Sequence, residues 1–171
     1  MKLLFLAIAA TSFFQIQKCE ALNISDLIGN WKLKATVVVN GKKISATGPT
    51  TITSEIDYDW EVPRSATVVR SSIKIKGAPQ IFTEEFFYDD GGYYGSSSAG
   101  EEYSFGDWSV SENKIDLSTQ EYEYDYFDDT AVEIGTTSFT YTVKGRKKIV
   151  VSGTSSYGVR FSGVYTRKGK W

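Results

Sequence analysis

The chain has 171 residues, with 19 Lys and Arg against 21 Asp and Glu, and carries a net charge of −2 at neutral pH. This mild acidity argues against a nucleic-acid partner, because binding to phosphates requires a basic surface. The sequence has no His and one Cys, Cys19. It therefore offers no imidazole and no paired thiols for zinc, copper or haem iron, and no Ser-His or Cys-His nucleophile pair. We expect no metal site, no cofactor and no enzymatic activity.

The N-terminal residues have the pattern of a secretory signal peptide. A charged tip precedes a mostly apolar run over 3–14, which is too short to cross a bilayer. Small residues ending at Ala21 occupy the two positions that a signal peptidase reads. We expect a signal peptide over 1–21, a secreted protein with one mature domain over 22–171, and no membrane span; the alternative is an unprocessed cytosolic N-terminus. The only N-glycosylation sequon makes Asn23 a candidate glycosylation site in a eukaryotic host.

The first strand of the mature domain is expected from Trp31 to Val39. Its apolar side chains recur at every second position, with lysines and a threonine between them, which is typical of a half-buried strand. Asn40 and Gly41 follow, and both residues tolerate positive φ, so a two-residue hairpin is predicted. In that hairpin Val37 would face Ile44, an apolar pair that supports the register.

The rest of the chain also has strand patterns. Residues 94–100 are small and polar and are expected to form a loop. We count eight to ten strands and no long helix, which favours an all-β barrel or sandwich. After the first hairpin, strands are expected at 50–58, 66–76, 81–88, 102–110, 114–127, 136–143, 147–154 and from 158 onward.

The last strand ends on a charge with inward parity. Phe161, Gly163 and Tyr165 alternate on one face, and Arg167 falls on that same face. A charge at this position needs a partner, and an aromatic ring can provide one through cation–π contact. Trp31 would lie beside Arg167 if the first and last strands pair and close a barrel.

These features resemble the lipocalins and the wider calycin group. A helical turn leads into Gly-x-Trp at Gly29 and Trp31, an Arg ends the last strand, and residues 86–117 repeat the rhythm of aromatic strand, Asp-Gly turn and Gly-x-Trp strand. The resemblance covers about 26–168. It implies a single antiparallel up-and-down β-barrel of eight to ten strands, with Gly29, Trp31 and Arg167 forming a plug at the closed end. No cysteine bridge or helix after the last strand is present, so the family's ligands do not carry over.

Tyrosines and acids alternate over 121–129, so the tyrosines share one face of a strand. The run is open to four interpretations: a wall of phenol groups around a ligand, a calcium site, sulfated tyrosines, or a strand with an aromatic inner face. Glu84 and Glu85 are adjacent and face opposite sides, so they form no catalytic carboxylate pair. The expected ligand contacts are the aromatic residues Trp108, Tyr122, Tyr124, Phe139 and Tyr141, while their neighbours Ser109, Glu123 and Thr140 are expected to face water.

Two functions are compatible with these patterns. The first is a monomeric carrier that binds a small hydrophobic or amphiphilic molecule in the barrel interior. The second is a filled barrel that acts as a protein-interaction module through its loops or its acidic face, because large side chains can occupy the whole interior of a small barrel. The interior volume separates the two, since a cavity of roughly 300 Å³ or more favours the carrier.

Overall fold

The computed structural model describes residues 22, 24–98, 102–125 and 130–169, without the side chains of Ser25 and Asp125. The expected signal peptide and Asn23 lie outside the described residues. Secretion and glycosylation therefore stay predictions.

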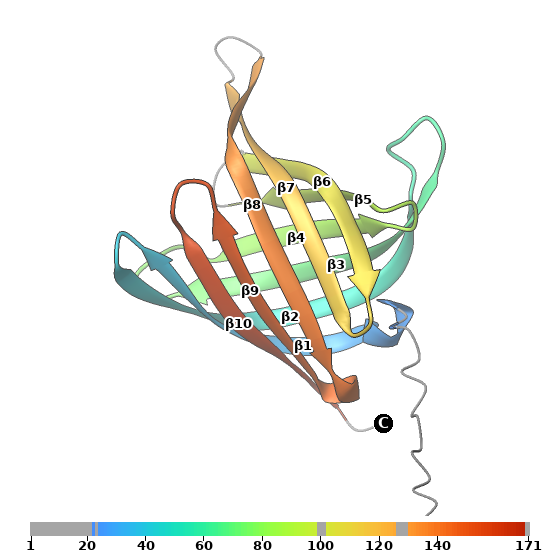
Figure 1. Cartoon of the computed structure of the whole chain (residues 1–171), viewed down its shortest axis with the longest axis horizontal. Helices are drawn as coiled ribbons and strands as arrows, with labels where there is room; N and C mark the ends of the chain where they lie inside the picture. Colours follow the sequence, from blue (N-terminus) through green and yellow to red (C-terminus); the bar gives the residue numbers. More distant parts are fainter. Residues whose placement is uncertain (1–21, 23, 99–101, 126–129, 170–171) are drawn as a thin grey trace, which may run out of the picture.

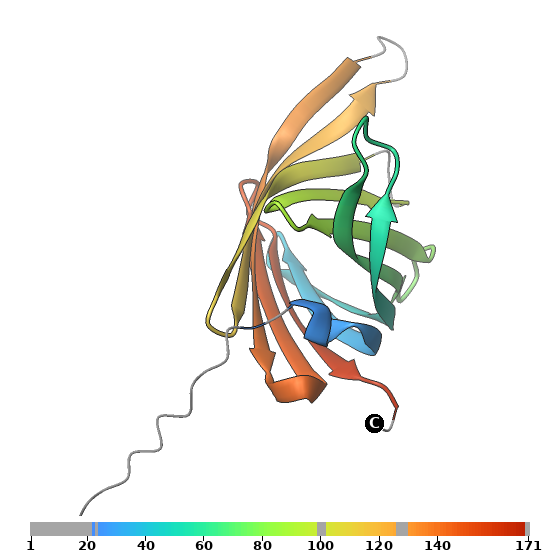
Figure 2. The same cartoon turned by 90° about the vertical axis from the view of Figure 1, so that its right-hand side faces the viewer.

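Ten antiparallel strands form one closed barrel, in which each strand pairs with its neighbours in sequence and β1 pairs with β10 (Figures 1 and 2). This confirms the predicted all-β, up-and-down barrel. The helical elements of the described chain are two 3-10 turns, η1 (Ile24–Leu27) and η2 (Gly145–Lys147), and neither has the length and apolarity to cross a membrane. The strands are β1 (Gly29–Val39), β2 (Lys42–Asp57), β3 (Arg64–Ile75), β4 (Ile81–Tyr88), β5 (Gly92–Ser97), β6 (Glu102–Ser111), β7 (Lys114–Asp125), β8 (Thr130–Lys144), β9 (Lys148–Ser155) and β10 (Arg160–Arg167).

The first hairpin has the expected register. Asn40 and Gly41 adopt φ of 49° and 74°, and Val37 faces Ile44 across the two strands. Positive φ at both central residues matches the right-handed twist of the flanking strands. The turn therefore sets which residues of β1 and β2 point into the barrel.

The expected loop over 94–100 is wrong, because its first half belongs to β5. This strand pairs with β4 on one side and β6 on the other, with Tyr94 between Phe86 and Phe105. Serines and glycine have low strand propensity, but two flanking strands supply the backbone hydrogen bonds that hold the segment extended. At Gly95 an added Cβ would lie 2.4 Å from the Tyr93 hydroxyl, so a side chain here would displace the Tyr93 phenol.

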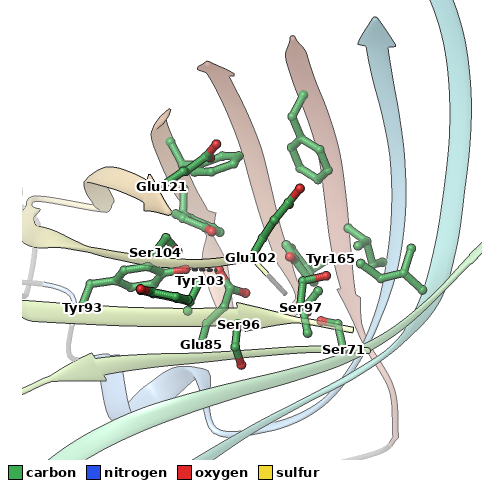
Figure 3. A pocket seen from close by; sticks show the side chains of 17 residues that line it. Ser71, Glu85, Tyr93, Ser96, Ser97, Glu102, Tyr103, Ser104, Glu121 and Tyr165 are labelled. Atoms are coloured by element: carbon green, nitrogen blue, oxygen red, sulfur yellow. Dashed lines mark hydrogen bonds between the residues drawn. The ribbon is translucent and has the colours of Figure 1, made fainter. Parts of the chain in front are cut away.

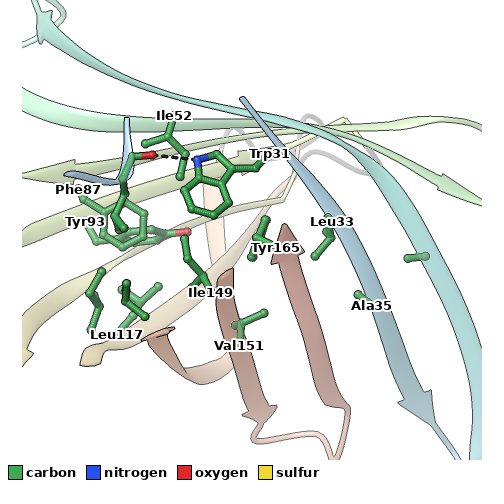
Figure 4. Packing of buried hydrophobic residues seen from close by; sticks show 14 residues of the cluster. Trp31, Leu33, Ala35, Ile52, Phe87, Tyr93, Leu117, Ile149, Val151 and Tyr165 are labelled. Carbon is green, nitrogen blue, oxygen red and sulfur yellow. Dashed lines mark hydrogen bonds between the residues drawn. The ribbon is translucent and has the colours of Figure 1, made fainter. Parts of the chain in front are cut away.

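The hydrophobic core fills the closed end of the barrel (Figure 4). Trp31 is completely buried there, and its Nε1 donates a hydrogen bond of 2.8 Å to the carbonyl oxygen of Leu27 in η1. The 3-10 turn thus lies across the barrel end and holds the indole in place. The other labelled members of the cluster are Leu33, Ala35, Ile52, Phe87, Tyr93, Leu117, Ile149, Val151 and Tyr165.

Arg167 lies over Trp31 at this closed end. The two residues face each other across β1 and β10, and the guanidinium carbon is 5.1 Å from the centre of the indole ring. Arg167 also donates hydrogen bonds to the carbonyl oxygens of Asp26 at 3.1 Å and Arg146 at 3.2 Å, and to that of Ile28. One side chain therefore connects β10 with η1, β1 and η2.

Gly29 makes room for this contact. Its φ is +144°, and an added Cβ would lie 3.0 Å from Nη2 of Arg167. A side chain here would be strained and would push the guanidinium away. Both residues of the Gly-x-Trp pattern therefore have a physical role. Gly29 leaves space for the Arg167 side chain, and Trp31 provides the ring on which the guanidinium lies.

Candidate functional site in the barrel interior

A cavity of about 240 Å³ lies inside the barrel, beyond the closed-end core (Figure 3). We call this cavity the calyx. Many of its lining residues come from strand ends remote from Trp31, among them Glu102, Glu121 and Phe161. Its wall is partly apolar, with Ile73 and Phe139, and partly polar, with serines of β3, β5 and β6. The interior is therefore packed at one end and open at the other.

Glu85 is the charged residue of the calyx floor. On β4, Thr83 and Glu85 line the calyx and Phe87 is buried in the core, whereas Glu84 points outward and its carboxylate lies 2.6 Å from Arg70. The two adjacent glutamates thus face opposite sides of the barrel wall, as their strand positions predict. Glu85 also borders a second, apolar void of about 30 Å³ toward the core.

Phenol groups surround the Glu85 carboxylate. The Tyr93 hydroxyl donates a hydrogen bond of 3.1 Å to Oε1, and the Tyr141 hydroxyl also hydrogen-bonds to this side chain. Tyr165 lies close enough to Glu85 that the carboxylate opposes ionisation of the Tyr165 phenol. Figure 3 shows the Tyr93 hydroxyl and the Glu85 carboxylate pointing toward each other.

The protonation states of this cluster follow from its burial. Burial raises the pKa of Glu85 to about 7, although the hydrogen bonds from Tyr93 and Tyr141 oppose the shift. Burial, reinforced by the nearby carboxylate, also raises the pKa values of Tyr93, Tyr141 and Tyr165. The three phenols therefore stay protonated as donors, while Glu85 exists in both forms near neutral pH.

Glu121 brings a second carboxylate to the calyx. It accepts a hydrogen bond of 2.6 Å from the Tyr157 hydroxyl and another from Thr137. Burial and this carboxylate raise the pKa of Tyr157 to about 12, so the phenol remains a donor. None of the calyx-lining residues in the described chain is Lys or Arg.

Three of the five expected ligand contacts point into the barrel, and two of them line the calyx. Phe139 and Tyr141 are part of the calyx wall. Trp108 lies deeper, where its Nε1 donates to the Tyr88 carbonyl oxygen at 2.9 Å and its ring packs on Phe87 at 5.9 Å. Trp108 is therefore a partly buried neighbour of the core and not a lining residue of the calyx.

Neither Tyr122 nor Tyr124 is among the residues that line the calyx. The inner face of β7 is set by the buried residues Ile115, Leu117 and Thr119, and continuing that alternation brings Glu121 inward. Tyr122 has the opposite parity and packs on Phe105, which is exposed on the outer face. The pairing of β7 with β8 shifts its register between Glu121 and Tyr122, just before Tyr124. The expectation placed the more apolar side chains of this run inside, whereas the alternation through Ile115 and Leu117 gives Tyr122 the opposite parity.

Tyr122 continues a stripe of aromatic rings that runs along the outer face from Tyr103, which also borders the calyx. It packs on Tyr103 at 5.7 Å and on Phe105 at 6.2 Å between ring centres. The contacts continue through Tyr94, Phe86 and Tyr88 to Trp60, with centroid distances of 5.3 to 6.1 Å. We call this series the outer aromatic stripe.

Sequence patterns did not identify Glu85, Tyr93 or Tyr165 as members of the interior site. One signal was available, because Glu85 shares its parity with Phe87. A carboxylate on the apolar side of a strand indicates a buried ionisable group. Among the described residues, no group of three or more His, Cys, Asp or Glu side chains could hold a metal ion.

Comparisons with known proteins support the fold. No protein-family model matches the chain, and no curated protein matches its sequence. The crystal structure of Rv2717c from M. tuberculosis superposes with a TM-score of 0.52 at 13% identity, over 85% of this chain and 95% of that one. This likeness shows a shared barrel fold and does not establish lipocalin or calycin membership.

Two redesigned β-barrels are also similar in shape. The barrel b11L5F_LGL has a TM-score of 0.47 and 13% identity, over 85% of this chain and 94% of the other. The barrel mFAP1, in a structure bound to DFHBI, has a TM-score of 0.46 and 11% identity, over 84% and 96% of the two chains.

Proposed function

We propose that this chain is a secreted binding protein that holds a small molecule in the calyx and performs no catalysis. The observation that carries the proposal is the open cavity of about 240 Å³ above the packed core. An apolar wall with a few convergent polar groups is the usual composition of a ligand site. Phe139 and Phe161 provide the apolar surface here, and Glu85 and Tyr141 provide the polar groups.

The ligand is expected to be small. The calyx lies just below the roughly 300 Å³ at which pockets for drug-sized molecules begin, and the barrel beyond it is occupied by the core. A short molecule with one ring or a short chain fits this volume better than a long lipid. A cavity of about 240 Å³ does not reach the volume expected to favour the carrier, but it is also not the interior of a completely filled barrel.

A panel of short aromatic and aliphatic compounds, titrated by calorimetry into the full chain, tests calyx binding. Phe139→Ala removes a wall residue and should weaken any binder by about 1–3 kcal/mol, because a ring in contact is lost. Ser138→Ala is the matched control, since Ser138 is exposed on the outer face of the same strand. Equal effects of the two variants would place the site outside the calyx.

Secretion is tested separately. A eukaryotic or bacterial host that exports the chain should yield a mature protein whose N-terminal sequence begins at Leu22. An intact N-terminus on soluble intracellular protein would contradict the expected signal peptide over 1–21.

The outer aromatic stripe favours a second candidate function, a protein-interaction module. Phe105 is 41% exposed within the stripe, and aromatic residues are enriched at protein interfaces. If Phe105→Ala abolished self-association or partner binding while no compound entered the calyx, this second function would replace the first.

A further inference from the structure

The neighbouring residues Glu84 and Glu85 have different partners on the two faces of the barrel wall. On the outside, Glu84 pairs with the Arg70 guanidinium at 2.6 Å. On the inside, the hydrogen-bond partners of Glu85 are the neutral phenols of Tyr93 and Tyr141. Glu85 is half-buried, and a carboxylate partly withdrawn from water is destabilised unless it is neutralised by a proton or by a positive charge. The described wall of the calyx provides no such positive charge.

The other ionisable groups of the calyx strengthen this asymmetry. Glu102 and Glu121 lie toward its mouth, and no Lys or Arg is among the lining residues of the described chain. A low-dielectric cavity lined by charge of one sign attracts small ions of the opposite sign. The interior therefore favours a cation over an anion.

The rest of the wall indicates what kind of cation fits. The described residues gather no set of metal ligands, and the carboxylate oxygens of the calyx share it with aromatic and aliphatic side chains. Tyrosine and phenylalanine rings attract ammonium groups through their negative faces and also pack against apolar groups. An organic cation fits both the carboxylates and the apolar side chains of this wall, whereas a bare metal ion fits only the carboxylates.

We propose that the calyx ligand is a small organic amine, with its ammonium group at the Glu85 carboxylate and its apolar part against Phe139 and Phe161. This inference rests on the proposed function, because it requires that the calyx binds a small molecule. The ammonium group takes the place that a proton occupies in the empty calyx. The Tyr93 and Tyr141 hydroxyls keep the carboxylate in position.

A series of three probes with one carbon skeleton tests this assignment. Phenethylamine, 2-phenylethanol and phenylacetate are cationic, neutral and anionic at about pH 8, and each is titrated into the full chain by calorimetry. We expect the amine to bind at least about tenfold more tightly than the alcohol, and the carboxylate to bind most weakly. Glu85→Gln should remove the preference for the amine over the alcohol, whereas Glu84→Gln on the outer face should leave the affinities of both probes as in wild type.

The pH dependence of amine binding tests the same assignment without a variant. Phenethylamine stays protonated between about pH 6 and pH 8, so a change in its affinity reports on the protein. With the pKa of Glu85 at about 7, the ionised fraction and hence the affinity should rise about tenfold over this interval. The other ionisable groups around Glu85 or on the calyx wall are Tyr93, Tyr103, Tyr141, Tyr165, Glu102 and Glu121.

Each contrary result has a distinct meaning. If the alcohol binds as tightly as the amine, or the carboxylate binds best, the calyx is a small-molecule site but the ligand is not a cation. A pH-independent affinity for the amine would remove Glu85 as its partner. If none of the three probes binds, the amine assignment fails, and the wider compound panel decides whether the calyx binds any ligand.

Discussion

Arg167 at the closed end of the barrel and Glu85 on the calyx floor both carry ionisable side chains, and their surroundings differ. Arg167 at the closed end has three backbone carbonyl oxygens and the Trp31 ring as partners, all supplied by the chain. Glu85 in the calyx has phenol hydroxyls as partners and faces an open cavity. A charge that the fold itself satisfies stabilises the structure. A charge that the fold leaves to a proton or to an incoming molecule is a candidate for function.

Glu85→Gln should produce the largest effect, through the pH dependence of stability. Because the pKa of Glu85 is about 7 in the folded chain and 4.5 as its ordinary value, the folded state keeps a proton that the unfolded state has lost. The stabilisation is complete below about pH 4.5 and is lost as pH rises to about 7, a change of roughly 3 kcal/mol. Urea unfolding of wild type and variant across this range measures it. A constant difference between the two proteins from pH 4 to pH 8 would contradict the assignment.

Arg167→Ala should destabilise the chain by about 2 kcal/mol at every pH in that range, because carbonyl hydrogen bonds and the cation–π contact are lost together. Arg160→Ala is the control, since Arg160 is exposed on the same strand, and it should change stability by less than about 0.5 kcal/mol. If both variants unfolded at the same urea concentration, the closed end would not depend on Arg167.

Tyr93→Phe should have an effect of about 1 kcal/mol, the net value of one hydrogen bond. Since that bond favours the ionised carboxylate, its loss should also move the pKa of Glu85 further upward. The stability profile of the variant should therefore level off at a higher pH than that of wild type. Tyr94→Phe, on the outer face, provides the comparison, and an identical profile for both variants would show that Tyr93 does not hold Glu85.

Tyr122→Ala should give the smallest effect, about 0.5–1 kcal/mol, from the loss of its stacking on Tyr103. It should change the affinity of calyx ligands little, because Tyr122 is not among the residues that line the calyx. Calorimetry with any confirmed calyx ligand measures this, and weaker binding by the variant would restore Tyr122 to the interior wall.

The closed end could be predicted from sequence because its features are local. The alternation of β1, the inward parity of Arg167 and the pair Gly29 and Trp31 each follow from strand period and side-chain chemistry. Strand pairing between β1 and β10 then places Trp31 beside Arg167. The repeated pattern of short strands and turns predicts the all-β class, and the pairing of β1 with β10 closes the sheet into a barrel.

The calyx was harder to predict because its features depend on neighbouring strands. The extended form of β5 comes from its pairing with β4 and β6 and not from its own serines and glycines. The orientation of Tyr122 depends on the register that Leu117 sets five residues earlier. Whether a Lys or Arg side chain lies near Glu85 depends on several strands. This cannot be read from any single stretch of sequence.

The seam between β1 and β10 has a consequence for how the chain folds. Every other strand pair joins neighbours in sequence, whereas this one brings Trp31 to Arg167 from opposite ends of the described chain. Contacts between residues this far apart in sequence are expected to form late, because closing so long a loop has a large entropic cost. Arg167→Ala should then accelerate unfolding more than it slows folding. Until the seam closes, the sheet has two unpaired edges, so the last step of folding also removes the surfaces through which β-sheets aggregate.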